Sequence, residues 1–200
     1  MKNLVILGAG TGGTIVANRM RRRLPSDWNL TAVDPAPVHL YQPGLLFLPF
    51  GAKDEGKMLR ARRGTLGSGV AWVERSVERV ETERRRVRLS GGDSLPYDLL
   101  VLASGARLRP DLTAGIEDGR RLGTVHDFYT LEGAQALRAA LAGFTEGRLV
   151  VNVVEMPIKC PVAPLEFLFL ADAFFRKRGV RDRIELVYAT PLDGAFTRPL

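Results

Sequence analysis

The sequence predicts an α/β protein built on a parallel sheet, and three observations support this fold class. Short apolar runs without alternation, at residues 4–7 and 30–33, are typical of strands that are buried on both faces. A glycine-rich turn at residues 8–13 separates the first run from a helical segment. The order strand, helix, strand begins at residue 4 and again at residue 149, and it predicts parallel strands joined by crossover helices.

The first of these units is expected to end with a strand that stops at Asp34. Its helix covers residues 14–23, because Pro25 lies just beyond and cannot continue a helix. The other elements expected in this half are an ordered, proline-rich loop at 35–51, a small antiparallel piece with strands at 70–80 and 86–89, and a buried strand at 97–103.

A second set of elements follows Arg109-Pro110, where a proline and a charge after a strand indicate a domain boundary. Residues 130–143 predict a helix with leucine and alanine on one face, and residues 149–154 predict a strand. Residues 164–178 predict a helix that is apolar around most of its circumference and is therefore buried. A strand at 184–189 completes a second Rossmann-like unit.

The composition is that of a globular protein with a basic surface, since 46% of the residues are hydrophobic and the formal net charge is +7. This charge favours contact with an anionic partner such as lipid headgroups, and the alternative is a solvated basic surface. Basic runs at 19–23, 60–63 and 84–86 are not interleaved with aromatic residues, so nucleic acid is not expected to bind.

We expect a cytoplasmic or peripheral membrane location. No apolar stretch is long enough to span a membrane, and the short run after Lys2 does not form a signal peptide. The single cysteine, Cys160, excludes an intrachain disulfide within these residues and fits a reducing compartment. His39 and His126 lie far apart without ligand-like spacing, so no metal site is expected.

Residues 8–13 match the dinucleotide fingerprint G-x-G-x-x-G, which follows a strand, opens a helix and has Asp34 at the end of the next strand. The first glycine permits a tight turn, the second lets backbone amides approach the pyrophosphate, and the third lets the helix pack on the strand. The helix N-terminus attracts phosphate, and Asp34 can accept hydrogen bonds from a ribose diol. The alternative is a glycine-rich turn without a ligand. The expected cofactor-binding residues in this turn are Gly8, Gly10, Thr11, Gly12 and Gly13.

A second signature favours FAD over NAD as the cofactor. The strand at 97–103 ends in Ala103-Ser104-Gly105, which resembles the Ala-Thr-Gly signature of two-domain flavoproteins, with Ser104 in place of threonine. Both residues offer a hydroxyl group. The alternative is a buried strand that ends in a small turn. In such flavoproteins a strand between the two signatures passes the adenine, and Val77 is the residue expected there.

The second strand–helix junction carries a cysteine where another glycine fingerprint would sit. Residues 155–167 contain no glycine, and their three prolines supply no amide donors. A nicotinamide nucleotide is therefore not expected to bind here. Cys160 lies beside Lys159 and just before a helix, and both features favour the thiolate and lower the pKa of a thiol. The alternative is a buried, inert cysteine.

Together these features resemble the sulfide:quinone oxidoreductases and the related flavocytochrome c sulfide dehydrogenase flavoprotein. The match covers the whole chain, which looks like the N-terminal half of such a protein, and the segment Pro157–Pro161 is its most specific part. The resemblance implies a FAD-binding Rossmann-like domain at residues 1–110. It also implies that residues 111–200 form the first part of a second Rossmann-like domain, which carries the redox cysteine.

The resemblance further implies catalytic roles and partners. Cys160 would belong to a redox pair near the flavin, and Glu166 would assist proton transfer. Sulfide would be oxidised to polysulfide, and its electrons would pass through FAD to quinone at a membrane surface, with a homo-oligomer allowed. Glu166 also fits a simpler role, because negative charge in the first turn of a helix is stabilising.

Two departures from the family pattern leave alternatives open. A further cysteine that many members carry upstream is missing from residues 126–129. The partner cysteine, the quinone site and the membrane-binding helices are expected in a C-terminal half that these residues do not reach. The first alternative is another FAD oxidoreductase of the superfamily, such as a type II NADH:quinone oxidoreductase. The second is a catalytically silent FAD-binding module.

Overall fold

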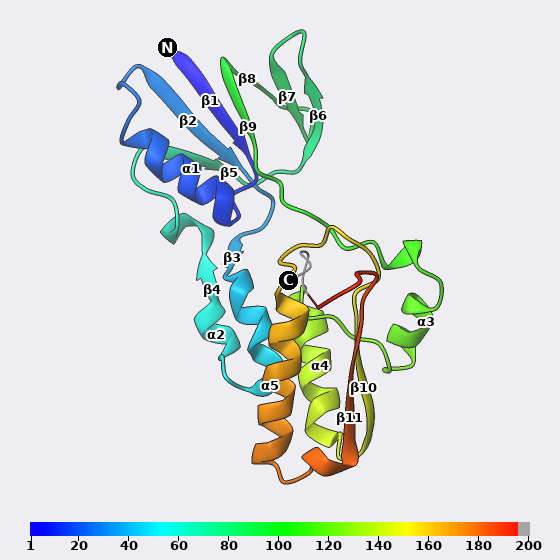
Figure 1. Cartoon of the computed structure of the whole chain (residues 1–200). Coiled ribbons are helices and arrows are strands. Elements are labelled where there is room, and N and C mark those ends of the chain that lie inside the picture. Colours follow the sequence, from blue (N-terminus) through cyan, green and yellow to red (C-terminus); the bar gives the residue numbers. More distant parts are fainter. Residues whose placement is uncertain (196–200) are drawn as a thin grey trace. The chain divides into compact units, whose positions relative to one another are not determined.

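The computed structural model describes residues 1–195, and these form two compact units (Figure 1). The first unit contains residues 1–41 and 56–107. The second contains residues 42–55 and the chain from Leu108 onward. Among residues 1–195, no helix combines the length and the apolar character that crossing a bilayer requires.

The first unit is built on a four-stranded parallel sheet with the strand order β5-β2-β1-β9. Leu4 of β1 lies opposite Leu30 on one side and Leu99 on the other, and every pairing in the sheet is parallel. The predicted α/β class is therefore confirmed. The strands are β1 (Lys2–Leu7), β2 (Trp28–Val33), β5 (Val70–Val73) and β9 (Leu99–Leu102).

The two faces of this sheet are covered by different layers (Figure 1), and the residues of β1 contact these layers alternately. Leu4 and Ile6 pack in one cluster with Ala17 of helix α1 (Thr11–Arg21). Val5 and Leu7 pack in another cluster with Val87 and Leu89 of an antiparallel sheet. Because neighbouring side chains of a strand point to opposite faces, this continuous apolar run supplies both clusters. The antiparallel sheet consists of β6 (Val77–Glu81), β7 (Arg86–Leu89) and β8 (Ser94–Pro96).

The antiparallel piece expected at residues 70–80 and 86–89 is only partly present as predicted. Its second half is correct, because β6 pairs antiparallel with β7. The prediction for residues 70–73 was wrong, since these residues form β5 and pair in parallel with β2. The sequence of a short apolar strand does not indicate which strand it pairs with. Here Val70 packs against the cluster under α1.

The segment expected to be a proline-rich loop contains ordered elements. Strand β3 (Val38–Leu40) pairs antiparallel with β4 (Leu59–Ala61), which was not predicted. Prolines break the regular hydrogen bonding of long helices, so the remainder forms short turns. The other short elements in this region are the 3₁₀ helices η1 (Gln42–Leu46), η2 (Leu48–Phe50) and η3 (Arg62–Gly64) and the helix α2 (Glu55–Met58).

The second unit contains the predicted strand–helix–strand arrangement. Strands β10 (Gly147–Asn152) and β11 (Ile184–Ala189) pair in parallel, and helix α5 (Ala163–Lys177) connects them in sequence. Helix α4 (Leu131–Gly143) precedes β10, and the Thr130 hydroxyl accepts a hydrogen bond from the Gly133 N–H at 3.0 Å. The short elements of this unit are η4 (Pro110–Leu112), α3 (Ile116–Arg121) and η5 (Arg181–Arg183).

The core of this unit is aromatic. Phe167 and Phe175 of α5 are buried, and the ring of Phe167 stacks on Phe128 with 4.9 Å between centroids. Phe50 of η2 packs at 5.0 Å from the same Phe167 ring. The 42–55 segment therefore belongs to this unit because its apolar side chains complete this core.

Two phenylalanines of α5 provide a test of this packing. Phe175 is fully buried, whereas Phe169 is 74% exposed. The expectation that this helix is buried around most of its circumference was therefore wrong, because its buried residues lie along one face. Phe175→Ala is expected to lower the free energy of unfolding by about 3–5 kcal/mol, because it removes a large buried ring and leaves a cavity. Phe169→Ala, on the same helix, is expected to change it by less than about 0.5 kcal/mol. Urea unfolding monitored by circular dichroism measures both, and equal losses would contradict the assigned core.

Candidate functional site

Three strands of the parallel sheet end at the same edge, and the predicted cofactor residues other than Val77 lie in the segments that follow these strands. The Gly8 N–H donates to the Val33 carbonyl at 2.8 Å, and the Ala103 N–H donates to the Leu7 carbonyl at 2.8 Å. The fingerprint therefore lies between the residues that follow β2 and those that follow β9. Ligands of open parallel sheets bind at this carboxyl edge.

The glycines of the fingerprint divide into two kinds. Gly8 has φ of +96°, and a Cβ there would lie 2.3 Å from the Ala103 carbonyl oxygen. A Cβ on Gly13 would lie 1.8 Å from the Gly8 carbonyl oxygen. By contrast, nothing lies within 4 Å of a Cβ built on Gly10 or Gly12. The first kind allows backbones to pack, and the second leaves the start of α1 accessible.

The N-terminus of α1 is suited to an anion. Helix α1 begins at Thr11, three residues earlier than expected, so the last glycines of the fingerprint form its first turn. Gly10 occupies the N-cap position without a side chain to cap the helix, and the first turn holds no acidic residue. Amides at such a terminus have no partner within the helix and carry partial positive charge. This part of the chain therefore fits the diphosphate of FAD, with Thr11 and Gly12 exposed beside it.

The side chain of Asp34 forms a hydrogen bond with the fingerprint. Its Oδ2 accepts a hydrogen bond from the Ala9 N–H at 2.7 Å, and its Oδ1 accepts one from the Ala36 N–H at 2.9 Å. Trp72 Nε1–H donates to the backbone carbonyl of Asp34 at 3.0 Å. The carboxylate is thus held beside the anion-binding turn, where a ribose hydroxyl would meet it.

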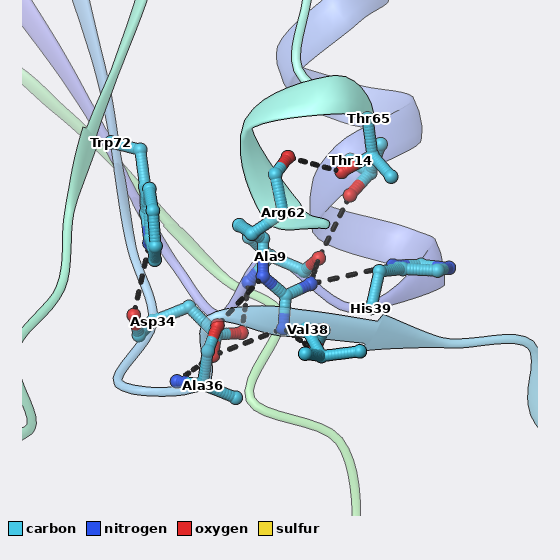
Figure 2. Close-up of polar contacts among 9 residues, drawn as sticks. All are labelled: Ala9, Thr14, Asp34, Ala36, Val38, His39, Arg62, Thr65 and Trp72. Carbon is cyan, nitrogen blue, oxygen red and sulfur yellow. Dashed lines mark hydrogen bonds and ion pairs between the residues drawn. The ribbon is translucent and has the colours of Figure 1, made fainter. Parts of the chain in front are cut away.

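Arg62 is the site residue that the sequence did not reveal. Its guanidinium contacts Asp34 with 3.2 Å between Nη2 and Oδ1, and its Nη1 donates to the Ala9 carbonyl (Figure 2). The side chain is 4% exposed. Arg62 belongs to a run of basic residues, a pattern that is typical of a solvated surface. Nothing in the sequence of that run distinguishes the buried arginine from its exposed neighbours.

The remaining cofactor residues lie apart from this cluster to different degrees. Ser104 and Gly105 follow Ala103 directly and are exposed, and Gly105 has φ of +76°. Val77 begins β6 and pairs with Leu89 in the antiparallel sheet, where it is 37% exposed. A contact of Val77 with adenine stays a prediction.

Cys160 lies in the turn between β10 and α5 and is exposed. The alternative of a buried cysteine is therefore wrong. Its φ of +57° is unusual for a residue with a side chain. Its carbonyl accepts a hydrogen bond from the Ala163 N–H at 3.0 Å at the start of α5. Strained backbone that persists at a single exposed thiol is a common feature of functional turns.

Charged and polar groups surround this turn within the second unit. Lys159 donates a hydrogen bond from Nζ to the side-chain oxygen of Gln42. Glu166 lies exposed in the first turn of α5, which suits both of its proposed roles. The pKa of the Tyr129 phenol is raised to about 12, chiefly by burial and then by the nearby Cys160 and Tyr188. The Tyr129 hydroxyl therefore stays protonated, and it has no hydrogen-bond partner among the described residues.

Substitution of one glycine of each kind provides a test, because one change should affect flavin binding and the other should affect stability. Gly10→Leu is expected to leave the fold intact and to abolish flavin binding, because its side chain would fill the space beside the helix N-terminus. Gly13→Ala is expected to lower the melting temperature of the flavin-free protein, because its Cβ collides with the Gly8 carbonyl.

Thermal unfolding of the flavin-free variants, together with chromatography of the flavin released from the wild type, measures these effects. FAD, not FMN, is expected. An unchanged FAD content in Gly10→Leu would show that the cofactor does not lie at this turn.

Comparisons with known proteins agree with this geometry. The mitochondrial sulfide:quinone oxidoreductase of Mus musculus is 30% identical over 193 residues, which cover 96% of this chain and 43% of that protein. A type II NADH:quinone oxidoreductase of Haemophilus influenzae is 31% identical over 134 residues, covering 59% of this chain and 30% of that protein. The chain thus spans less than half the length of these relatives.

A solved structure and a family model also match this chain. The X-ray structure of the sulfide:quinone oxidoreductase from Aquifex aeolicus matches with a TM-score of 0.81 and 22% identity, covering 98% of this chain and 45% of that one. The model of the family described as pyridine nucleotide-disulphide oxidoreductase matches residues 2–152. The chain therefore belongs to the pyridine nucleotide-disulphide oxidoreductase family, whose members are FAD-binding flavoproteins.

Proposed function

We propose that this protein oxidises sulfide and passes the electrons through FAD to quinone. The observation that carries this proposal is the exposed Cys160 in a glycine-free turn before α5, in a chain that resembles sulfide:quinone oxidoreductases over 96% of its length. In this proposal residues 1–110 hold FAD, and residues 111–200 carry the reactive thiol. Glu166 assists proton transfer.

The two strand–helix turns of the chain differ in the way that this function requires. The turn before α1 is open beside Gly10 and Gly12, so a diphosphate can approach its backbone. The turn before α5 contains Pro157 and Pro161 instead, and Pro164 lies in the first turn of α5. None of these prolines has an N–H to donate. This contrast disfavours the NADH:quinone alternative, because NADH needs a second open turn.

The proposed reaction balances without a further reactant except a proton from solvent. Each hydrosulfide ion loses two electrons and one proton and becomes a zero-valent sulfur atom that joins a polysulfide. Each quinone gains two electrons and two protons and becomes a quinol. FAD, when bound, carries the electron pair between the two. In the complete protein Cys160 and a partner cysteine, expected elsewhere, would begin the cycle as a disulfide. Hydrosulfide would attack this bond and break it, leaving a persulfide on one cysteine and a thiolate on the other. The two cysteines would then bond again through the added sulfur, and the proton and two electrons released in this step would pass to solvent and to FAD.

Contact with a membrane surface belongs to the same proposal. Quinones are apolar and reside in bilayers, and the net charge of +7 favours anionic headgroups. A peripheral position and a homo-oligomer stay predictions. If the complete protein retains FAD but turns over with no electron donor, the alternative of a silent FAD-binding module replaces this proposal.

The first test concerns the electron donor. NADH and NADPH are expected to leave the flavin oxidised, because the turn before α5 lacks the glycines that a nicotinamide nucleotide requires. Sulfide is expected to reduce it. Stopped-flow absorbance of the flavin band after mixing with each donor measures this. Rapid bleaching by NADH would favour the NADH:quinone reading over sulfide oxidation.

The second test concerns the thiol. In the complete protein, Cys160→Ser is expected to retain FAD and to lose sulfide-driven flavin reduction by orders of magnitude, because a hydroxyl does not form a persulfide. Glu166→Gln is expected to lose less, about 10²–10⁴-fold, as is typical of proton-transfer assistance. Sulfide-dependent quinone reduction compares the variants, and FAD content controls for folding. Near-wild-type rates in Cys160→Ser would refute this mechanism.

A further inference from the structure

Within residues 1–195, Arg62 is the one charged residue that is buried. It lies in η3, directly after β4, and its neighbours Arg60, Ala61 and Arg63 are exposed. A buried guanidinium is costly unless it is paired and its donors are used. Its location therefore requires specific partners, and all of those described belong to the first unit.

The partners of Arg62 come from two segments that are distant in sequence (Figure 2). Nη1 donates to the Ala9 carbonyl inside the fingerprint. After β2, Nε donates to the Ala36 carbonyl at 3.1 Å, and Nη2 donates to the Val38 carbonyl at 2.9 Å. Nη2 also forms an ion pair with Asp34 Oδ1 at 3.2 Å. Arg62 thus joins the fingerprint turn to the carboxylate and to the start of β3.

His39 adds one more contact to this cluster. Its Nδ1 lies 3.3 Å from Arg62 Nη1. A guanidinium has no acceptor, so Nδ1 is the acceptor in this contact.

A count of hydrogen bonds shows what the arginine leaves open on Asp34. A carboxylate offers about two acceptor sites on each oxygen. Oδ1 already accepts from the Ala36 N–H and contacts Arg62. In the part of the chain that the structure describes, Oδ2 accepts from the Ala9 N–H alone. One acceptor site on Oδ2 is therefore available, and the side chain is 14% exposed, which leaves it within reach of a ligand.

We propose that Arg62 is a positioning residue of the cofactor site, which holds Asp34 so that the free site on Oδ2 faces one ribose hydroxyl of FAD. This inference rests on the proposed FAD binding. Arg62 itself does not touch the cofactor. Its guanidinium contacts Oδ1, and its hydrogen bond to the Ala9 carbonyl holds the same residue whose N–H donates to Oδ2. The planar fork of arginine suits this arrangement, because its donors point in several fixed directions, whereas lysine has one nitrogen.

A double-mutant cycle distinguishes positioning from a merely structural role. The complete protein is freed of flavin, and FAD rebinding is followed by fluorescence quenching for Arg62→Met, Asp34→Asn and the double variant. Each single change is expected to raise the FAD dissociation constant by roughly tenfold to a hundredfold, the usual worth of a bond to a charged group. The double variant is expected to bind about as weakly as Asp34→Asn, because Arg62 acts through that carboxylate.

Two controls keep the result interpretable. Arg63→Met removes the same charge from the adjacent exposed residue, whose guanidinium lies 5.8 Å from the Trp72 ring, and FAD affinity is expected to stay unchanged. Arg62→Lys keeps the buried charge and is expected to bind FAD with intermediate affinity. If Arg62→Met leaves Asp34 unpaired and unfolds, the double variant and Arg62→Lys still report on the site, since neither leaves a carboxylate without a counter-charge.

The outcomes separate this inference from the proposed function. Wild-type protein that binds no FAD would overturn both. Wild-type protein that binds FAD, with an unchanged dissociation constant in folded Arg62→Met or Arg62→Lys, would overturn the positioning role alone. Effects of Arg62→Met and Asp34→Asn that multiply in the double variant would also overturn it, because independent action excludes a route through Asp34.

Discussion

The cofactor site depends on the close approach of three backbone segments at the carboxyl edge of the parallel sheet. Gly13 at the start of α1 touches Gly8 after β1, and Gly8 touches Ala103 after β9, with no room for a Cβ at either glycine. This contact places the N-terminus of α1 at the carboxyl edge of the sheet. It also places the end of β2 beside the turn, because β2 and β9 flank β1. This packing brings together the three segments that follow β1, β2 and β9.

Much of this architecture was predictable from the sequence, because it rests on local patterns. Buried strands need continuous apolar runs, and a dinucleotide turn needs glycines at fixed positions. The spacing of Asp34 from the fingerprint follows from the length of one strand–helix–strand unit. The helix of residues 163–177 was predictable for a similar reason, since its apolar residues surround most of the helix and Pro164 is favoured near a helix start.

The errors and omissions concern contacts between segments that are distant in sequence. The local sequence of residues 70–73 is compatible with a strand in the parallel sheet or in the antiparallel sheet. Packing of Val70 in the cluster under α1 places this strand in the parallel sheet. Arg62 lies in a basic run, and its burial depends on acceptors at Ala9, Asp34 and Ala36 that the chain brings together by folding. No propensity or spacing encodes such a contact, because charged residues are buried only where specific partners are present.

The two strand–helix turns show how one architecture supports two chemistries. At α1 the N-cap residue Gly10 and the next glycine, Gly12, leave space beside the helix terminus, so its amides are available to an anion. At α5 the same kind of terminus carries prolines and an exposed thiol held at φ of +57°. Partial positive charge at a helix start favours a bound phosphate in the first case, whereas the second turn places a thiol where a phosphate would approach. The chemistry of each turn therefore follows from which side chains stand before the helix, while the parallel strands and the helix provide the same electrostatic setting to both.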